Sequence, residues 1–460
     1  MGYLKCLVAV LPLLFVVTFY GLAQAVEDYP DDADIVPGEI VVKFKEIGPN
    51  TVHPAAAPPD GFNVVGETSN GALKLQVDPS NPEAQQGEAA LKKHTLEQVG
   101  ELKQKNYVEY AHPNYRVRAQ VLQDTEPNDP KYQDQWAFND HTGHGISLRK
   151  LWEFQTEAPS IVVAVLDTGI TKDNEDIDPD VLVAGYDFVS KPEDSQDGHG
   201  RDPDPSDVDF NGACLSPLAK WHGTQVASLI GAVKTNNQKG IAGINWKVKI
   251  QPIRVMGPCG GDITDVADAI RWAVGKHVDG VPDNITPARI INLSMEGKAK
   301  CSDIPEVQSA IDEAIKAGAI IVVAAGNYNR DVSRTYPASC NGVIVVAASD
   351  VNGKLTNYSG YGPGVTIMAP GGDFFDVPKP TGILTAVKGD YAFNKGTSFS
   401  APIVSGVLAL WLAAKPSLSH DEVLQLIKSA AIRRDSLQCP RLCGFGLFNA
   451  FPFPESDFRH

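Results

Sequence analysis

Three short segments of the chain carry residue types that could together perform nucleophilic catalysis. Asp167 follows an apolar run, His222 opens a predicted helix, and Ser398 lies just after a glycine at the start of another predicted helix. A serine hydroxyl is a weak nucleophile at neutral pH and needs an adjacent base, which a histidine oriented by a carboxylate can supply. Each residue alone also has an ordinary interpretation, as a turn former, a helix-start residue or a helix cap. The hypothesis therefore depends on the fold bringing the three together.

The elements that must position these residues alternate along the chain from about residue 127 onward. Near-continuous apolar strands alternating with helices predict a parallel sheet covered on both faces. Ligands in such folds bind beyond the carboxyl ends of the strands, where we expect the three residues to meet. Pro402 is expected in the first turn of its helix, where proline is tolerated. The predicted strands are 161–166, 248–255, 290–293, 320–324 and 343–347, and the predicted helices are 222–233, 263–278, 304–317 and 398–414.

Segments 165–169, 222–224 and 396–398 resemble the signature segments of the subtilisin-like serine proteases, the subtilases, in that family's Asp–His–Ser order. The resemblance covers roughly residues 127–452 and implies an α/β fold, a doubly wound parallel sheet of the subtilisin type. It also implies a secreted endopeptidase that hydrolyses peptide bonds through an acyl-enzyme intermediate, with Ser398 as nucleophile, His222 as base and Asp167 orienting the imidazole. The alternatives are a transpeptidase with the same triad and a non-catalytic scaffold, against which the intact triad argues.

The resemblance further implies residues that contact the substrate. Segment 324–327 is similar to the segment that carries the family's oxyanion asparagine, so Asn327 is expected to donate its side-chain amide together with the Ser398 backbone amide. Glu296 stands where many relatives have a glycine; it could favour basic side chains or face solvent. Thr335 also replaces a frequent glycine, which implies a shorter primary pocket and no preference for the largest aromatic side chains. The expected substrate-binding residues are Ser294, Met295, Glu296, Gly297, Ala325, Gly326 and Thr335.

Two further departures from the family pattern lie near His222. Gln225 replaces a frequent histidine, and Ser228 replaces a common glycine. Neither is a triad position, so we expect altered packing near the site and unchanged chemistry.

Residues 1–25 have the organisation of a secretory signal peptide: a positive charge at Lys5, an apolar run at 6–20 and an A-x-A cleavage site at 23–25. A membrane anchor is the alternative, but spanning a bilayer takes about 20 apolar residues. No later segment reaches that length without charges. We therefore expect a secreted, extracellular protein without a membrane partner, and a periplasmic stage in transit stays open.

Residues 26–122 have a pattern of their own. Alternating strands at 39–44 and 72–77, a polar amphipathic helix at 89–105 and a strand at 108–117 predict a small α+β domain. This domain is similar to the inhibitory, chaperone-like propeptides of the family. The resemblance implies that its last strand inhibits the enzyme intramolecularly and that the protease cuts itself between 118 and 124. A binding domain kept in the mature protein is the alternative.

The peptidase domain is then 123–460, and we expect a monomer that acts on protein or peptide substrates. A net charge of −16 argues against a nucleic-acid partner, because phosphate binding needs basic surface. Acidic residues are concentrated between residues 171 and 210, a segment that contains thirteen acidic residues and only three basic ones. Such a stretch is either a solvated loop or a site for a hard cation.

The chemistry requires no cofactor, but a structural calcium ion is expected. Calcium prefers oxygen ligands, and the resemblance implies that Asp180 and Asn237 provide some of them. The acidic run 197–207 is a second candidate, with Asp197, Asp202 and Asp204, and a solvated loop is its alternative.

Six of the seven cysteines follow the signal peptide, and in an exported chain they suggest three disulfides whose pairing the sequence alone leaves open. The segments around them look like those of extracellular subtilases from Gram-negative bacteria. That resemblance implies the pairs Cys214–Cys259, Cys301–Cys340 and Cys439–Cys443.

Overall fold

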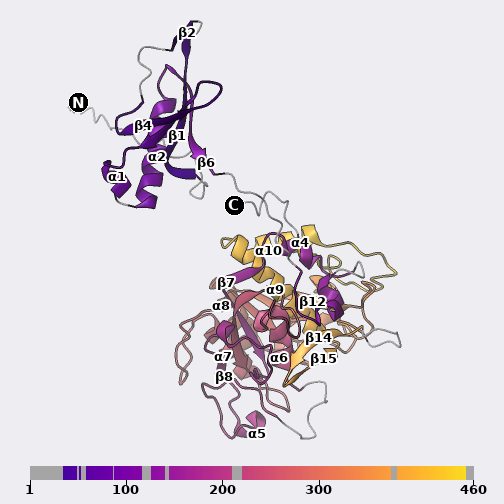
Figure 1. Ribbon diagram of the computed structural model, residues 1–460. Coiled ribbons are helices and arrows are strands. Elements are labelled where there is room, and N and C mark those ends of the chain that lie inside the picture. Colours follow the sequence, from indigo (N-terminus) through magenta and orange to yellow (C-terminus); the bar gives the residue numbers. More distant parts are fainter. Residues whose placement is uncertain are drawn as a thin grey trace, which may run out of the picture. The chain divides into compact units, whose positions relative to one another are not determined.

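A computed structural model describes residues 35–48, 51–52, 58–85, 87–116, 126–139, 144–209, 220–373 and 381–451. These residues form two compact units, one of residues 35–116 and one of residues 126–451 (Figure 1). The predicted signal peptide, the predicted maturation segment 118–124 and Cys214 lie outside the described residues.

The smaller unit is an antiparallel sheet with one long helix against it. Its strand order is β4-β5-β1-β6, and α2 packs on β1 and β6. Buried and partly exposed residues alternate along much of β1, as expected for a sheet with one covered face. The prediction missed β4, an edge strand in which only Phe62 is buried, so that no alternation is visible. The elements are β1 (Ile35–Phe44), β2 (Glu46–Gly48), β3 (Thr51–Val52), β4 (Phe62–Glu67), β5 (Leu73–Val77), α1 (Pro82–Gln85), α2 (Glu88–Lys103) and β6 (Val108–Tyr115).

The larger unit is built on a seven-stranded parallel sheet with the order β13-β12-β11-β10-β7-β9-β8. This confirms the predicted doubly wound α/β fold. The prediction missed β8 and β13, the short strands at the two edges of the sheet. The strands are β7 (Glu157–Asp167), β8 (Tyr186–Asp187), β9 (Lys247–Arg254), β10 (Ile290–Leu293), β11 (Ile320–Ala324), β12 (Ile344–Ser349) and β13 (Ile367–Pro370), and a separate hairpin is formed by β14 (Ile383–Val387) and β15 (Asp390–Asn394).

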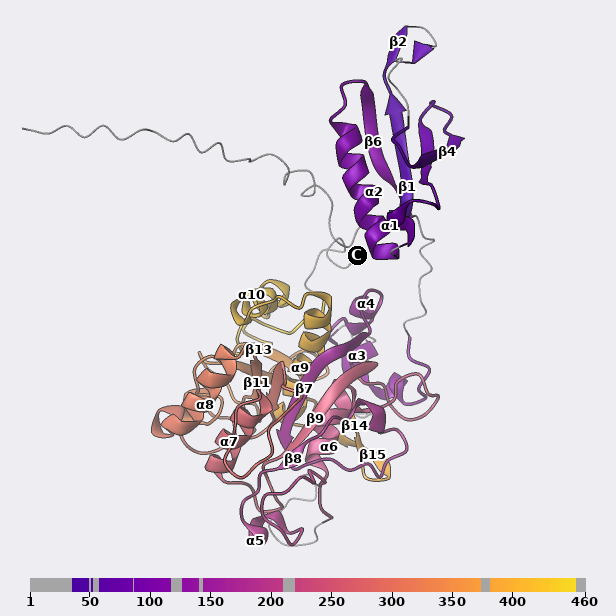
Figure 2. The ribbon, with the colours of Figure 1, turned by 90° about the vertical axis from the view of Figure 1, so that its left-hand side faces the viewer.

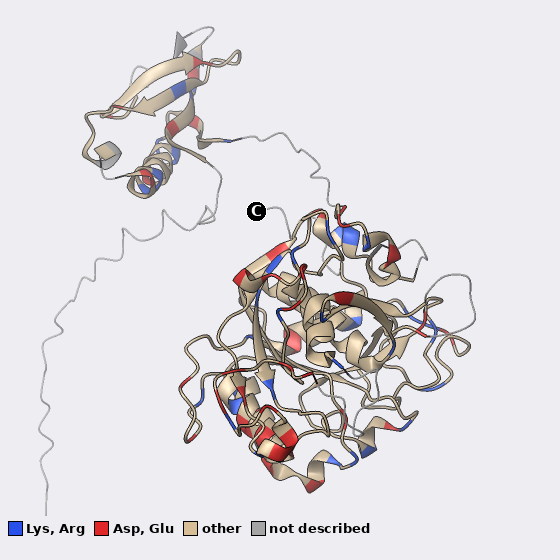
Figure 3. Ribbon diagram, turned by 60° about the horizontal axis from the view of Figure 1, so that its bottom comes forward, with Lys and Arg blue, Asp and Glu red and all other residues tan. Residues whose placement is uncertain are grey.

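Helices cover both faces of this sheet (Figure 2). Val163 and Val165 of β7 pack in one apolar core with α6 and α9, whereas Val162 and Ala164 pack in another with α7 and α8. Charged residues lie mostly at the periphery of the unit (Figure 3). The helices are α3 (Trp136–Asn139), α4 (Leu148–Trp152), α5 (Pro192–Ser195), α6 (His222–Ala227), α7 (Ile263–Ala273), α8 (Pro305–Lys316), α9 (Thr397–Ala414) and α10 (His420–Ala430).

Helix α9 is the central helix of the larger unit. Among the described residues it alone is long and apolar enough to cross a membrane, but 89% of it is buried inside the protein, so it is a core helix. Pro402 lies in its second turn, not in the first as predicted. A proline there leaves the carbonyl of Ser398 without its helical N–H donor. The hydroxyl of Ser294 donates to that carbonyl instead, at 2.9 Å.

Two predicted helices are shorter than their apolar patterns. The pattern 222–233 changes from α-helix to a π-helical turn at Ser228 and ends at Ala232. The pattern 263–278 ends as a helix at Ala273, two residues before Gly275, which has a φ of 78°. A left-handed glycine is a common helix terminator, and the apolar residues beyond it are buried without continuing the helix.

Strand β7 lies inside the sheet, with β9 and β8 on one side and β10 to β13 on the other. The connections therefore reverse direction next to β7, and the carboxyl ends of the strands there form the usual binding position of such folds. Asp167 is the last residue of β7, and the segments that follow β10 and β11 begin at the same edge.

Candidate active site

Asp167 and His222 are held together at this edge. His222 Nδ1 lies 2.7 Å from Asp167 Oδ1, and the same oxygen accepts the backbone N–H of Thr168 at 2.7 Å. The Asp167 side chain is buried, and the His222 side chain is 16% exposed. A buried carboxylate needs such partners. The contact fixes the imidazole with its other nitrogen free to exchange a proton.

A second carboxylate, that of Asp207, influences the same pair. It accepts the hydroxyl of Thr168 at 2.7 Å, and that hydroxyl oxygen accepts the backbone N–H of Gly223 at 3.0 Å. Burial raises the pKa of Asp207 to about 7. Burial of the imidazole lowers the pKa of His222, but the charge and hydrogen bond of Asp167 and the charge of Asp207 outweigh it, so the pKa is raised above its usual value.

Ser398 lies in the first turn of α9, beside His222. The turn begins after Gly396, whose φ of 152° favours glycine, and a Cβ at that position would lie in ordinary contact with Asn327 Nδ2, at 3.4 Å. The His222 ring lies 5.9 Å, centroid to centroid, from the ring of Phe399. Ser398 Oγ donates to the Ser294 carbonyl at 3.3 Å, and the described contacts include no bond between it and His222. Such bonds often form only when substrate is bound.

Asn327 is anchored so that one donor remains. Its Oδ1 accepts the backbone N–H of Thr397 at 2.9 Å and the Thr397 hydroxyl at 3.1 Å. Within the described part of the chain, Nδ2 has no hydrogen-bond partner, and the residue is exposed. The N–H of Ser398, in the first turn of α9, is also among the amides without a partner inside a helix. Two donors for a developing oxyanion are thus available near the Ser398 hydroxyl.

Six of the seven predicted substrate-binding residues lie on two neighbouring segments. Ser294 to Gly297 follow β10, and Ala325 and Gly326 follow β11, its parallel neighbour. Gly297 forms an antiparallel bridge with Tyr336, and a Cβ on it would collide with the Tyr336 ring. Glu296 is half-buried, and its Oε2 accepts the backbone N–H of Asn327 at 2.9 Å.

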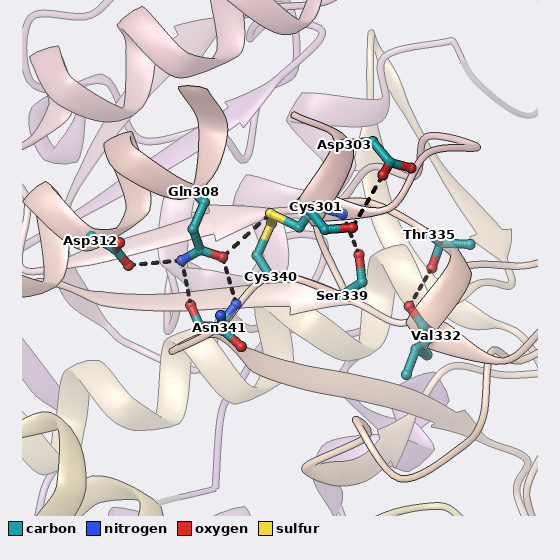
Figure 4. Close-up of a disulfide and its surroundings, with 10 residues drawn as sticks. Cys301, Asp303, Gln308, Asp312, Val332, Thr335, Ser339, Cys340 and Asn341 are labelled. Atoms are coloured by element: carbon teal, nitrogen blue, oxygen red, sulfur yellow. Dashed lines mark hydrogen bonds between the residues drawn. A yellow bond between two sulfur atoms is a disulfide. The ribbon is translucent and has the colours of Figure 1, made fainter. Parts of the chain in front are cut away.

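Thr335 lies in the loop that a disulfide ties to the segment after β10 (Figure 4). The residue is buried, and its hydroxyl donates to the carbonyl of Val332 at 3.2 Å. The bond between Cys301 and Cys340 joins the start of α8 to this loop, and the N–H of Cys301 donates to Ser339 Oγ at 2.9 Å. The disulfide therefore stabilises the loop that carries Thr335.

The other described cysteines also agree with the pairing that the resemblance implies. Cys439 and Cys443 form a disulfide close to the carboxyl end of the described chain. Cys259 is disulfide-bonded as well, but its expected partner Cys214 lies outside the described residues.

Gln225 and Ser228, the two departures near His222, both hold the hairpin β14–β15. Gln225 Oε1 accepts hydrogen bonds from Thr385 and Asn394, and the hydroxyl of Ser228 accepts the N–H of Ala386. Both side chains are buried. Neither contact involves Asp167 or His222, whose own contact is in place.

The two residues proposed from the resemblance as calcium ligands do not contact each other in the described structure. Asn237 contacts Asp176, through Nδ2 and Oδ1 at 3.0 Å, and not Asp180, which is exposed on a short turn at residues 179–181. Asp129 accepts the backbone N–H groups of Asn236 and Asn237 in the same loop. Burial raises the pKa of Asp176 to about 6, with a further contribution from the charge of Asp129. The described residues show no salt bridge to either carboxylate.

In the second calcium candidate, the acidic run 197–207, the three aspartate side chains already have partners within the protein. Asp197 forms an ion pair with the fully buried Arg254, at 2.6 Å, and Arg254 also pairs with Asp187. Asp202 and Asp204 accept backbone N–H groups two residues further along the chain. No group of three His, Cys, Asp or Glu side chains able to hold a metal occurs in the described ranges.

Several residues around the site were not singled out from the sequence. Thr397 belongs to the Gly-Thr-Ser segment, yet its anchoring of Asn327 requires two segments 70 residues apart to meet. Asp207 was hidden in the acidic run, where nothing distinguishes it from its neighbours. Asp176 could have been weighed beside Asp180, since both follow the Asp167 segment.

Comparisons with known proteins agree with this geometry. The model of the subtilase family matches residues 159–446. An extracellular protease of Xanthomonas campestris pv. campestris is 40% identical over 340 residues, which cover 72% of this chain and 57% of that protein. An extracellular basic protease of Dichelobacter nodosus is 40% identical over 303 residues, covering 64% of this chain and 49% of that protein. The chain thus spans about half the length of these curated relatives.

Among solved structures, that of proteases from Pseudoalteromonas arctica is 38% identical, with a TM-score of 0.64. The match covers 70% of this chain and 97% of that chain.

Proposed function

The chain belongs to the subtilase family, as its signature segments predicted, and we propose that it is a secreted serine endopeptidase produced as an autoprocessed zymogen. The observation that carries the proposal is the Asp167–His222 contact beside the first turn of α9. Asn327 is hydrogen-bonded to that turn through its side-chain oxygen, which leaves its amide group available as a donor. The names of the Xanthomonas and Dichelobacter relatives support secretion and proteolysis.

In the proposed first step, Ser398 Oγ attacks the carbonyl carbon of the scissile peptide bond. His222 Nε2 takes the hydroxyl proton, while Asp167 holds Nδ1–H and stabilises the imidazolium. The carbonyl oxygen becomes an oxyanion, which accepts hydrogen bonds from Asn327 Nδ2 and the Ser398 N–H. The imidazolium then gives its proton to the amine, which leaves with the carbonyl-side peptide bound to Ser398 as an ester.

In the second step, water attacks the ester carbon, and His222 takes its proton as before. The proton returns to Ser398 Oγ as the ester bond breaks, and the acid product leaves. Extended substrate is proposed to bind along residues 294–297 and 325–326, which follow the neighbouring strands β10 and β11, through backbone hydrogen bonds. The buried Thr335 supports a short primary pocket.

The mechanism predicts that activity falls as the pH is lowered. His222 must be neutral to act as a base, and its pKa is raised. We expect kcat/KM to fall on acidification with a midpoint above the usual histidine value of about 6.5. Asp207→Asn removes one of the negative charges that raise this pKa and should move the midpoint to lower pH. Hydrolysis of a peptide substrate measured from about pH 5 to 9 tests this; a midpoint that rises in the variant would contradict it.

The proposal includes maturation by the enzyme itself. A time course of the purified precursor, wild type beside Ser398→Ala, is followed by intact mass and by casein hydrolysis. Wild type should lose the 26–122 domain and digest casein into hydrolysed products, and Ser398→Ala should do neither. If both proteins mature alike, another protease cuts the linker. A wild-type precursor that stays intact and inert in calcium would contradict the proposed function.

We also propose a structural calcium site at Asp129, Asp176 and Asn237. The carboxylates of Asp129 and Asp176 lie beside the loop at 236–241, and burial disfavours their charged forms. A bound cation would favour the charged forms again. Carboxylate and amide oxygens are ligands that calcium prefers. The ion would stabilise the loop at 236–241 and would take no part in the chemistry.

This site predicts how stability responds to calcium. Removing calcium with EDTA should lower the melting temperature of the wild type by about 5–10 °C, the shift expected from a few kcal/mol of binding energy. Asp176→Asn should abolish most of this response. The control is Asp180→Asn, which should retain it, because Asp180 is exposed and contacts neither Asp176 nor Asn237 in the described structure. The reverse result would restore Asp180 as the ligand.

A further inference from the structure

The carboxylate of Glu296 lies against the backbone that carries Asn327. Its Oε2 accepts the N–H of Asn327 at 2.9 Å. A Cβ built on Gly326 would lie 2.5 Å from Glu296 Cδ and 2.6 and 2.7 Å from its two oxygens. The carboxylate therefore rests on the bare face of Gly326 and joins the segment after β10 to the segment after β11.

This contact has an electrostatic basis. Burial raises the pKa of Glu296, and the Asn327 N–H and the charges of Arg330 and Lys298 offset that effect in part. A half-buried carboxylate is costly unless it is hydrogen-bonded. A backbone N–H bonded to a charged acceptor is among the stronger hydrogen bonds. The carboxylate is thus held to Asn327 instead of extending into solvent.

Asn327 is consequently held at both of its ends. Thr397 binds the side-chain oxygen, and Glu296 binds the backbone N–H, so that Nδ2 is the donor of Asn327 that has no partner within the described residues. A glycine at position 296 would provide no acceptor for that N–H. We infer that Glu296 is a positioning residue of the oxyanion site, which fixes the backbone of Asn327 and thereby aims Nδ2 at the developing charge. The inference rests on the proposed function of Asn327.

This role differs from the attraction of a basic substrate side chain. A lysine or arginine that paired with Glu296 would compete with the Asn327 N–H for the same carboxylate. The nearby Lys298 and Arg330 also contribute positive charge, and both lie over the Tyr328 ring, at 5.6 and 5.5 Å. Positioning should therefore affect all substrates alike, whereas attraction would affect only basic ones.

The test combines Glu296→Ala and Glu296→Gln with Asn327→Ala. Two peptides that differ only in leucine or arginine before the scissile bond serve as substrates. Glu296→Ala should lower kcat about tenfold for both peptides, with little change in KM, because small misplacement of a catalytic donor is costly. Glu296→Gln should recover most of the loss, since its amide oxygen can accept the same N–H. In the Asn327→Ala background, Glu296→Ala should have no further effect.

Four results would overturn the inference. A loss confined to the arginine peptide and to KM would assign Glu296 to specificity. Losses that multiply in the double variant would show that it acts independently of Asn327. An Asn327→Ala variant with unchanged kcat would remove both the inference and the proposed oxyanion role, whereas a drop in Asn327→Ala without one in Glu296→Ala removes the inference alone.

Two further proteins keep the result interpretable. Glu306→Ala removes an exposed negative charge on α8 and should leave kcat unchanged. If Glu296→Ala does not fold, Glu296→Gly replaces it, because glycine also removes the acceptor and adds no side chain.

Discussion

Ser398→Ala is expected to lower the rate of peptide hydrolysis by about 10⁶-fold, about as much as removing the whole triad. Without Oγ no acyl-enzyme can form, and the remaining donors offer only weak stabilisation of direct attack by water. The variant cannot mature itself under the proposal. Both proteins should therefore carry a recognition site for an unrelated site-specific protease in place of residues 118–124, and the matured forms are compared with a peptide substrate.

The matched control for this substitution is Ser400→Ala, in the same turn of α9. The Ser400 hydroxyl is buried and donates to the carbonyls of Ala369 and Pro370, at 3.1 and 3.2 Å. Its loss should reduce the melting temperature and leave kcat close to that of the wild type. A Ser398→Ala variant that retains more than about a hundredth of wild-type kcat would exclude Ser398 as the nucleophile.

Asn327→Ala is expected to lower kcat by about 10²–10³-fold, equivalent to about 2.7–4 kcal/mol of transition-state stabilisation. KM should change little, because the donor acts on the oxyanion and not on the bound ground state. Steady-state hydrolysis of one peptide by the two proteins separates the two parameters. The residue is exposed and its side chain forms hydrogen bonds only with Thr397 in the described structure, so the fold should tolerate the change.

Asn329→Gly is the control for this second prediction. Asn329 is also exposed, lies two residues further on and has a φ of 53°, which glycine adopts without strain. Its side chain contacts Arg441 instead of the catalytic segments. The variant should keep kcat within about twofold of wild type. An equal loss in both variants would mean that the loop's shape, and not the Asn327 amide, supports catalysis.

The residues at strand ends and helix starts were predictable because their local sequence fixes their position. Asp167 must follow a buried strand, and His222 and Ser398 begin the helices that cover the same sheet, so their meeting follows from the topology of a parallel sheet. The edge strand β8 was missed because two residues leave too short a pattern. Strand β13 is as long as β10, which was predicted, but it ends at Pro370, and a proline argues against a strand.

Contacts between segments that are distant in the chain could not be predicted from the sequence. The pairing of Asn237 with Asp176 instead of Asp180 depends on which of two nearby acids turns inward. Pro402 was placed in the first helical turn because nothing local reveals that Ser294 would satisfy the carbonyl it leaves open. The orientation of Glu296 likewise follows from the absence of a side chain on Gly326 in another segment.

Covalent labelling of the matured enzyme tests the central claim most directly. Phenylmethylsulfonyl fluoride reacts with an activated serine by losing fluoride, and peptide mapping by mass spectrometry locates the adduct. The account predicts a single adduct on Ser398, formed in step with the loss of casein hydrolysis, and a much slower reaction in His222→Ala. An adduct on another residue, or full labelling of Ser398 with activity unchanged, would contradict it.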